Sequence, residues 1–187
     1  MSDPHVCARC AQKGPTCCQL DPGNEEFCFP LSEMERDRIL KELAGDEGAF
    51  AQQANTDGFV ENLHKLFPGE QQAVDKLFPG TKFHIRLAVD EQGRCRLLGP
   101  EGCRLPREAR PYYCRLFPFW FAGGKLNVFA ASRCLLQREA RTRLRMLALV
   151  GESDKRLKEL YGRLRLAWGL APRKGLPGID KCHRKKS

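Results

Sequence analysis

The spacing of its cysteines constrains this chain more than any other sequence feature. Cys95, Cys103 and Cys114 lie in a segment rich in proline, arginine and aromatic residues that continues to Phe119. Seven and ten residues separate the three cysteines, so no single helix or hairpin turn can present them all. Loops must bring them together, and ordering each loop residue costs roughly 1–2 kcal/mol of conformational entropy. A bound metal would offset that cost, so the segment predicts a metal site.

A second group of cysteines lies near the N-terminus. Cys7 and Cys10 have the spacing of a knuckle, a tight turn that directs two thiolates at one metal. The alternative, a redox disulfide of the thioredoxin kind, requires a preceding strand and a following helix, which the flanking residues do not predict. Cys17 and Cys18 follow directly. Because adjacent side chains start in different directions, one could bind at a first site and the other at a second, or one could lie outside the ligand shell.

The remaining sequence indicates where such a cysteine-rich chain would reside. No apolar run approaches the roughly 20 residues of a transmembrane helix, and the first residues lack the pattern of a signal peptide. We therefore expect a cytoplasmic protein with no membrane partner. In a reducing compartment, clustered cysteines indicate metal or redox chemistry more often than disulfides. Eight of the ten cysteines are clustered, which argues against a set of inert core residues.

Local patterns predict an α+β fold in which short hairpins and loops gather on the metal, with helices before and after. Ser32 and Glu35 form a capping box that starts a helix burying Met34 and Ile39. Residues 49–56 are expected to be a polar helix or a loop. The other predicted elements are helices at 57–66, 70–77, 135–150 and 153–168, a hairpin of residues 83–89 with 94–98, and a second hairpin that turns at Gly123 and Gly124.

The alternation in residues 83–89 also predicts which side chains face the interior. Ile85 and its apolar neighbours in register should be buried, whereas His84 should lie on the solvent face as a surface residue rather than a ligand. Cys95 in the returning strand should point inward. Cys28 lies between aromatic residues, so we expect a core residue there.

Four motifs together have a recognisable form: Cys7-x2-Cys10-x6-Cys17-Cys18, Cys95-x7-Cys103, Arg110-Pro111-x2-Cys114-Arg115-x-Phe117-Pro118-Phe119, and Cys134. They resemble the YkgJ-type cysteine-cluster family, which is described as a zinc- or iron-chelating domain. A related cysteine pattern occurs in flagellin lysine-N-methylases. The likeness covers roughly residues 7–134; Cys28 is an additional thiol, and the basic region after residue 135 is not part of the motif.

The resemblance implies a set of metal ligands more than an activity. An all-cysteine set suits zinc, iron alone or an iron–sulfur cluster, and eight thiols could fill two four-coordinate sites or only one. No catalytic constellation or cofactor-binding loop appears, so a methylase-like activity would rest on the resemblance alone and an enzyme is neither predicted nor excluded. The implied ligands are Cys7, Cys10, Cys17, Cys18, Cys95, Cys103, Cys114 and Cys134.

Arginines near the cysteines predict charge compensation of a thiolate site. Arg104, Arg107, Arg110 and Arg115 surround the central cysteines, where cations and N–H donors would offset the charge of the sulfurs. For Arg110 the sequence favours a role in orienting the Cys114 loop over a surface ion pair.

Charge is unevenly distributed along the chain. The net charge is +9, and residues 133–187 carry sixteen Lys/Arg against five Asp/Glu. Solvated helix faces are the first interpretation; an alternative function is a zinc-stabilised interaction module whose basic C-terminal helices bind an acidic protein or nucleic acid. We expect a metal-binding domain at 1–134, a helical extension packed on it at 135–170, and a basic flexible tail at 171–187 in which Cys182 and His183 are bystanders.

Overall fold

The computed structural model describes residues 6–14 and 16–173, and their fold is α+β, as the sequence predicts. Helices and strands alternate without a dominant sheet. In chain order, the helices are α1 (Val6–Lys13), α2 (Glu33–Glu42), α3 (Asp57–Leu66), α4 (Gln71–Leu77), α5 (Tyr112–Leu116), α6 (Leu135–Glu139), α7 (Arg143–Val150) and α8 (Asp154–Ala167). The strands are β1 (Phe50–Ala54), β2 (Phe83–Leu87), β3 (Leu98–Gly99), β4 (Gly102–Cys103), β5 (Phe119–Ala122) and β6 (Lys125–Val128).

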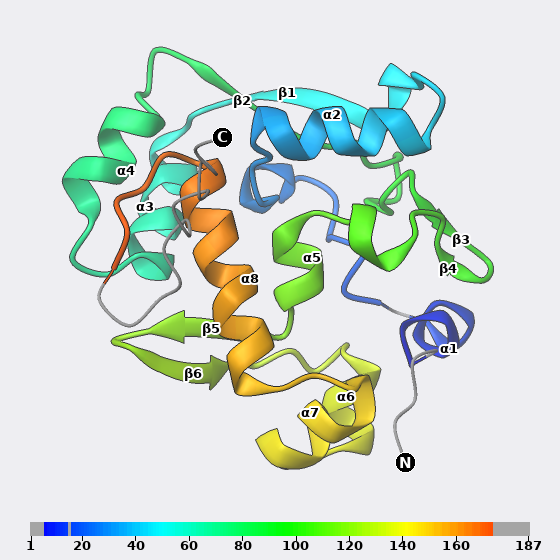
Figure 1. The fold of residues 1–187 in the computed structure, drawn as a ribbon. Helices are drawn as coiled ribbons and strands as arrows, with labels where there is room; N and C mark the ends of the chain where they lie inside the picture. Colours follow the sequence, from blue (N-terminus) through cyan, green and yellow to red (C-terminus); the bar gives the residue numbers. More distant parts are fainter. Residues whose placement is uncertain (1–5, 15, 174–187) are drawn as a thin grey trace, which may run out of the picture.

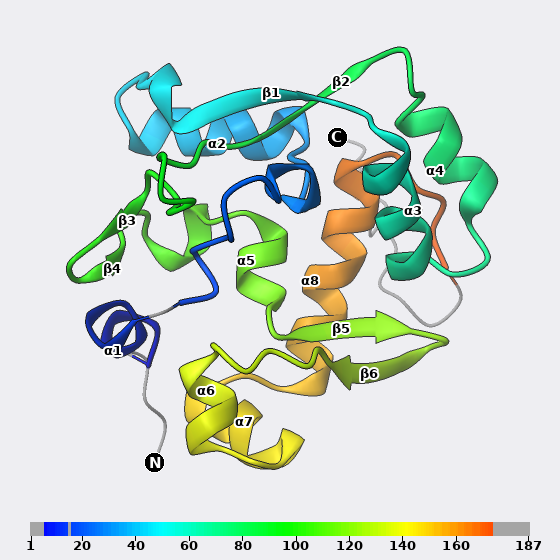
Figure 2. The same ribbon diagram turned by 180° about the vertical axis from the view of Figure 1, so that it is seen from behind.

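Helices α5 and α8 lie side by side, and α8 covers one face of the molecule (Figure 1). The β1–β2 ribbon crosses one end of the molecule next to α2, and the β5–β6 hairpin and the α6–α7 pair lie toward the other end (Figure 2). Helix α1 packs beside β4 and α6. Three separate two-stranded antiparallel sheets form among the described residues, so loops and helices rather than one sheet organise the fold.

The predicted hairpin of residues 83–89 with 94–98 forms only next to its turn, and the pairing expected for residues 83–87 is wrong. Strand β2 pairs instead with β1, in a register that places Ile85 opposite Gln52, and residues 49–56, expected as a helix or loop, supply that strand. At the turn end of the prediction the chain does fold back: Val89 bridges Cys95, and backbone hydrogen bonds join Asp90 to Arg94 and Arg96 to Ala88. Two helices separate β1 from β2 in the chain, so local alternation could not reveal this pairing.

The predicted solvent face of β2 is also wrong. His84 is 5% exposed, whereas Phe83 is 68% exposed. The His84 ring stacks on Phe59 of α3 at 3.9 Å between ring centroids, and its Nδ1 lies 2.8 Å from Asn55 Oδ1. Helix α3 therefore covers the face that alternation assigned to water, and burial lowers the pKa of His84 to about 4.

Elements with strong local signals follow the predictions. Ser32 and Glu35 form the expected capping box, α3 has the predicted bounds, and Gly123 and Gly124 turn the β5–β6 hairpin with positive φ angles. Two details differ. Met34 is 63% exposed, because Glu35 rather than Met34 faces inward at the start of α2. The predicted helix 135–150 is interrupted between α6 and α7.

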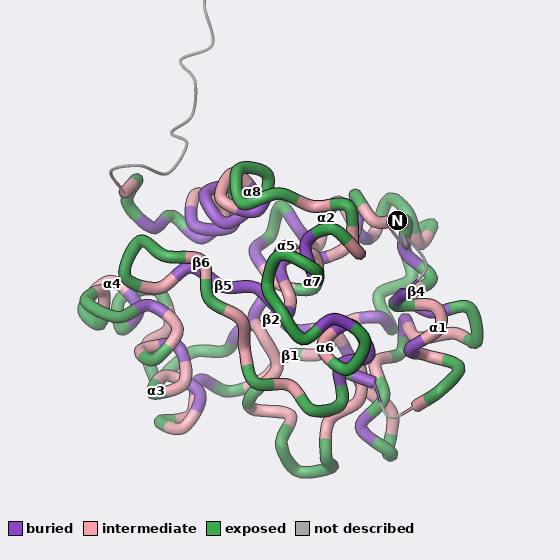
Figure 3. The backbone as a smooth tube through the Cα atoms, turned by 90° about the horizontal axis from the view of Figure 1, so that it is seen from below, coloured by how far each residue is buried: buried purple, intermediate pink, exposed green. Residues whose placement is uncertain are grey.

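The main core is aromatic and is shared by α3, α5, β5 and α8 (Figure 3). Trp120 of β5 contacts the rings of Phe67 and Tyr161. The inward stripe predicted for α8 is buried, and its members are Leu157, Leu160, Tyr161, Leu164 and Trp168. The α8 segment therefore packs into the same core as the cysteine-bearing part of the chain.

Arg165 fastens α8 to the loop before α4. Its guanidinium is 1% exposed and donates two hydrogen bonds of 2.7 Å to the carboxylate of Glu70, and a third to the carbonyl of Ala171. One of the basic residues of the C-terminal region is thus an internal structural group rather than a surface charge.

Replacing Ser153 with alanine should lower the free energy of unfolding by about 1 kcal/mol. The Ser153 hydroxyl caps α8 by accepting a hydrogen bond from the backbone N–H of Arg156 at 3.3 Å, and alanine leaves that donor to water. Urea denaturation monitored by circular dichroism measures the change. An unchanged transition midpoint would contradict the capping role.

Within the described residues, no helix is both long enough and apolar enough to cross a membrane. Residues 174–187 are outside the described part of the chain. The predictions for most of the basic tail, including Cys182 and His183, therefore fall outside the described residues.

Candidate metal centre

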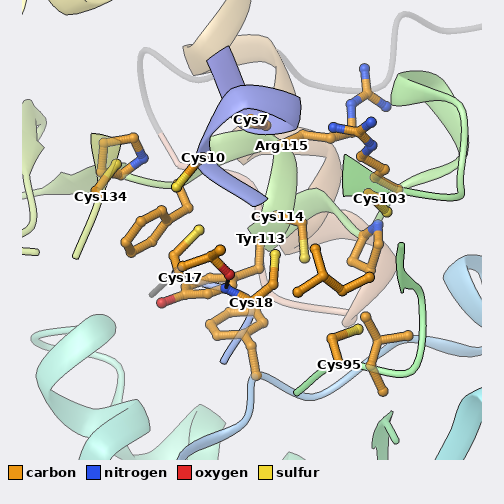
Figure 4. Close-up of a pocket in the computed structure, with 18 of the residues that line it drawn as sticks. Cys7, Cys10, Cys17, Cys18, Cys95, Cys103, Tyr113, Cys114, Arg115 and Cys134 are labelled. Carbon is orange, nitrogen blue, oxygen red and sulfur yellow. Dashed lines mark hydrogen bonds between the residues drawn. The ribbon is translucent and has the colours of Figure 1, made fainter. Parts of the chain in front are cut away.

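The eight cysteines named from the sequence line a single cavity of about 260 Å³. Figure 4 shows their side chains arranged around it, although they come from segments up to 127 positions apart in the chain. A ninth thiol, Cys28, lines the same cavity. All cysteines of the described residues are in the thiol form. The structure therefore brings the predicted set together from six segments: α1, the segment after it, the loop before β3, β4, α5 and the start of α6.

Cys7 and Cys10 lie on helix α1, so the predicted knuckle is wrong in its backbone form. A spacing of three residues on a helix still places both side chains toward one side. Helix α1 approaches β4 closely because Gly102 has a φ of +93°, and a Cβ at that position would lie 3.1 Å from the Cα of Ala8. This contact packs α1, which carries Cys7 and Cys10, against β4, which carries Cys103.

The segment that carries Cys17 and Cys18 is fixed by backbone hydrogen bonds. The Thr16 hydroxyl accepts a bond from the Cys18 N–H at 2.9 Å, and the Cys18 carbonyl accepts one from the Cys95 N–H at 2.8 Å. Gly93, with φ +74°, allows its loop to touch the Leu20 carbonyl, which a Cβ would meet at 2.3 Å. Two distant segments are thereby held in register, and Cys18 lies next to Cys95.

Helix α5 places Cys114 at the cavity wall, and a buried carboxylate positions the helix. Glu35 is 2% exposed; its Oε2 accepts bonds from the N–H and hydroxyl of Ser32, and its Oε1 accepts a 2.8 Å bond from the N–H of Tyr112. The capping residue of α2 therefore also binds the first N–H of α5. The sequence predicts the capping box but not the bond to Tyr112, which lies 77 positions further along the chain.

The thiols fall into two groups that meet at Cys17 and Cys18. Cys134 lies near Cys10, and Cys17 lies near Cys7 and Cys134. Cys114 lies near Cys18, Cys95 and Cys103. In Figure 4, Cys10 and Cys134 lie on one side of the cavity and Cys95 and Cys103 on the other, while Cys7, which Cys18 also affects, lies between them. We call the first set group A and the second group B. Group A contains Cys7, Cys10, Cys17 and Cys134, and group B contains Cys18, Cys95, Cys103 and Cys114.

Burial and mutual repulsion dominate the electrostatics of these thiols. Burial raises the pKa of Cys95 to about 12 and raises the pKa of Cys114 well above its ordinary value, although the Cys114 side chain retains exposed surface where it faces the cavity. Cys18 differs because the thiol of Cys17 hydrogen-bonds to its sulfur, which lowers the pKa of Cys18 and raises that of Cys17. A cation among the sulfurs would relieve the repulsion that the raised pKa values reflect.

The four arginines predicted around the site have different roles. Arg107 pairs with Glu152 at 2.5 Å and Arg115 pairs with Glu108 at 2.6 Å, while Arg104 is exposed and donates to a backbone carbonyl. Arg110 lines the cavity. Burial raises the pKa of Cys7 and of Cys103, and the charge of Arg110 opposes that rise; at Cys18 it adds to the Cys17 hydrogen bond that lowers the pKa.

Thiol proximity falls short of a ligand set. Within residues 6–14 and 16–173, no three or more cysteine, histidine, aspartate or glutamate side chains are arranged to hold a metal ion. Tetrahedral coordination at about 2.3 Å from zinc to each sulfur would bring four sulfurs within roughly 3.8 Å of one another. The residue types therefore fit a thiolate-bound metal, and side-chain rotations would be needed to close the sulfurs around it.

Cys28 is the residue that sequence reasoning placed differently, in the core rather than at the site. It is half-buried at the cavity wall, where burial raises its pKa and the Arg86 guanidinium lowers it. Phe29, the next residue, stacks on Tyr113 with 4.1 Å between ring centroids. Aromatic neighbours such as those of Cys28 are therefore found at the cavity wall as well as in the core.

In comparisons with known proteins, no family model, no curated protein and no solved structure matches the chain. The resemblance to the YkgJ-type family therefore stays a prediction that rests on the cysteine motifs. The acidic or nucleic-acid partner of the basic C-terminal region also stays a prediction.

Proposed function

We propose that this chain is a cytoplasmic metal-binding protein that chelates iron, alone or as an iron–sulfur cluster, or zinc, through cysteines of groups A and B. The observation that carries the proposal is the convergence of all eight motif cysteines on one cavity. Chance burial of small apolar residues would distribute thiols through the core rather than gather them from six chain segments around one space.

Details of the backbone support a site that is built rather than incidental. The thiol-bearing segments come into close contact at Gly102, at Gly93 and through the hydrogen bond between Cys18 and Cys95. The buried carboxylate of Glu35 orients the helix that carries Cys114. Buried polar groups are costly unless fully bonded. The buried carboxylate of Glu35 is explained if metal binding requires Cys114 to be held in a fixed position.

Iron is favoured over zinc as the occupant. The eight thiols line one cavity of about 260 Å³, and iron–sulfur clusters take such all-cysteine ligand sets. Aromatic side chains, including Tyr113, Phe117 and Phe119, form part of the wall and would exclude water from an oxygen-sensitive group. Soft thiolate ligands suit both iron–sulfur clusters and zinc.

Single serine variants test the two groups separately. Cys134→Ser removes a thiol of group A and Cys114→Ser removes one of group B, so each variant should retain roughly half of the wild-type metal content, because loss of one of four ligands opens one site and leaves the other. Metal per protein chain, measured on anaerobically purified protein, gives the result. Wild-type metal content in both variants would contradict the assignment of these cysteines as ligands, and complete loss in either would indicate one shared site.

A further inference from the structure

We propose that Arg110 is the residue that compensates the charge of the thiolate site and thereby sets how tightly metal is held. The inference rests on the proposed function and adds a positioning residue outside the ligand set. Four thiolates around a divalent ion leave a net charge of about −2, so two four-cysteine sites in one cavity need positive charge nearby. The cavity contains few groups that could supply it.

The arginines at the cavity differ in whether a carboxylate pairs with them. Arg107 and Arg115 each contact a carboxylate within 2.6 Å, so their charges are already balanced by Glu152 and Glu108. Arg110 donates through Nε to the Leu105 carbonyl at 3.0 Å, and no carboxylate of the described residues forms an ion pair with it. Its remaining N–H donors belong to a half-buried side chain that lines the thiol cavity.

The position of Arg110 relative to the thiols supports the same role. Its charge favours the thiolate form of Cys7 of group A and of Cys18 and Cys103 of group B, so one cation that lines the cavity affects both groups. Arg104 acts on Cys103 from an exposed position, where solvent screens its charge.

The backbone around Arg110 is fixed independently of any metal. The Arg38 guanidinium of α2 donates to the carbonyls of Ala109 and Arg110 at 3.3 and 3.1 Å, and its charge lies 4.7 Å above the ring of Tyr112. This frame holds the Arg110 backbone in place, so loss of its side chain should remove charge from the cavity without releasing the loop.

Three variants separate charge from structure. Arg110→Gln removes the charge, Arg110→Lys keeps a cation but loses the Nε bond to Leu105, and Arg104→Gln removes an exposed arginine close to the same thiol. For each variant purified without oxygen, the EDTA concentration that removes half of the co-purified metal is measured, with thermal unfolding as a check on folding. Arg110→Gln should release metal at about tenfold lower EDTA, the effect that an opposite charge at close range has on ionisation of a neighbouring group.

Arg110→Lys and Arg104→Gln should both stay within about threefold of wild type, because each leaves a cation beside the thiols. Equal retention by Arg110→Gln and wild type, or equal losses in the Lys and Gln variants, would overturn the role of charge and leave the proposed function intact. A wild-type protein that carries no metal would overturn the proposed function instead. If Arg110→Gln fails to fold, Arg110→Met takes its place, because it also removes the charge while keeping a long side chain, and it should lose metal as the glutamine variant is expected to.

Discussion

A Cys17→Ser/Cys18→Ser double variant should purify with almost no bound metal. The two residues are adjacent in the chain but belong to different thiol groups, Cys17 to group A and Cys18 to group B. Removing both takes one ligand from each group, and a site with three of its four thiolates holds a metal far less tightly. Metal content per chain after anaerobic purification measures the loss.

Cys28→Ser is the matched control for this variant. Cys28 lines the same cavity and is half-buried, so its replacement makes the same chemical change without removing a proposed ligand. It should keep the wild-type metal content. Each single variant, Cys17→Ser and Cys18→Ser, should keep roughly half. If the double variant retains full metal, the division of the thiols into groups A and B is wrong.

Replacing Glu35 with alanine should lower the free energy of unfolding by about 3 kcal/mol, because the change leaves buried N–H groups of Ser32 and Tyr112 without acceptors. The effect should extend to the site, since Cys114 is two residues beyond the released N–H of α5. Urea denaturation measures the stability, and metal content measures the displacement of Cys114.

Glu33→Ala is the control, because Glu33 occupies the same first turn of α2 but is exposed. Its stability should stay within about 0.5 kcal/mol of wild type. Glu35→Gln keeps one acceptor oxygen and should fall between the two. A loss below about 1 kcal/mol in Glu35→Ala would mean that the bonds between α2 and α5 contribute little to stability.

Elements specified by neighbouring residues could be predicted from the sequence. The capping box at Ser32, the bounds of α3 and the Gly123–Gly124 turn depend on contacts within a few positions, and all three predictions are confirmed. The inward stripe of α8 is confirmed for the same reason, since helical periodicity is read within two turns.

Contacts between distant segments could not be predicted in this way. Strand β2 pairs with β1 rather than with its nearest extended neighbour, and α3 buries His84 on the face that alternation gave to solvent. The second bond of Glu35, to Tyr112, joins residues 77 positions apart. These contacts depend on which surfaces meet in three dimensions, and the local pattern of a single sequence does not specify them.

The candidate site shows the same division. Cysteine spacing predicted the eight thiols that the structure gathers around one cavity, because the motifs themselves carry that signal. The spacing did not show how the thiols divide between two sites. It also predicted a knuckle for Cys7 and Cys10, which lie on helix α1. Cys28 was assigned to the core because its aromatic neighbours are equally typical of a core and of a cavity wall.

Elemental analysis with a visible absorption spectrum, on the full chain purified without oxygen, tests the central claim most directly. We predict iron together with acid-labile sulfide, and a coloured protein whose absorption is lost when the metal is removed. Zinc in a colourless protein would keep the thiolate site and replace iron as its occupant. A protein that contains neither metal, and takes up neither when its reduced thiols are offered each in turn, would contradict the account.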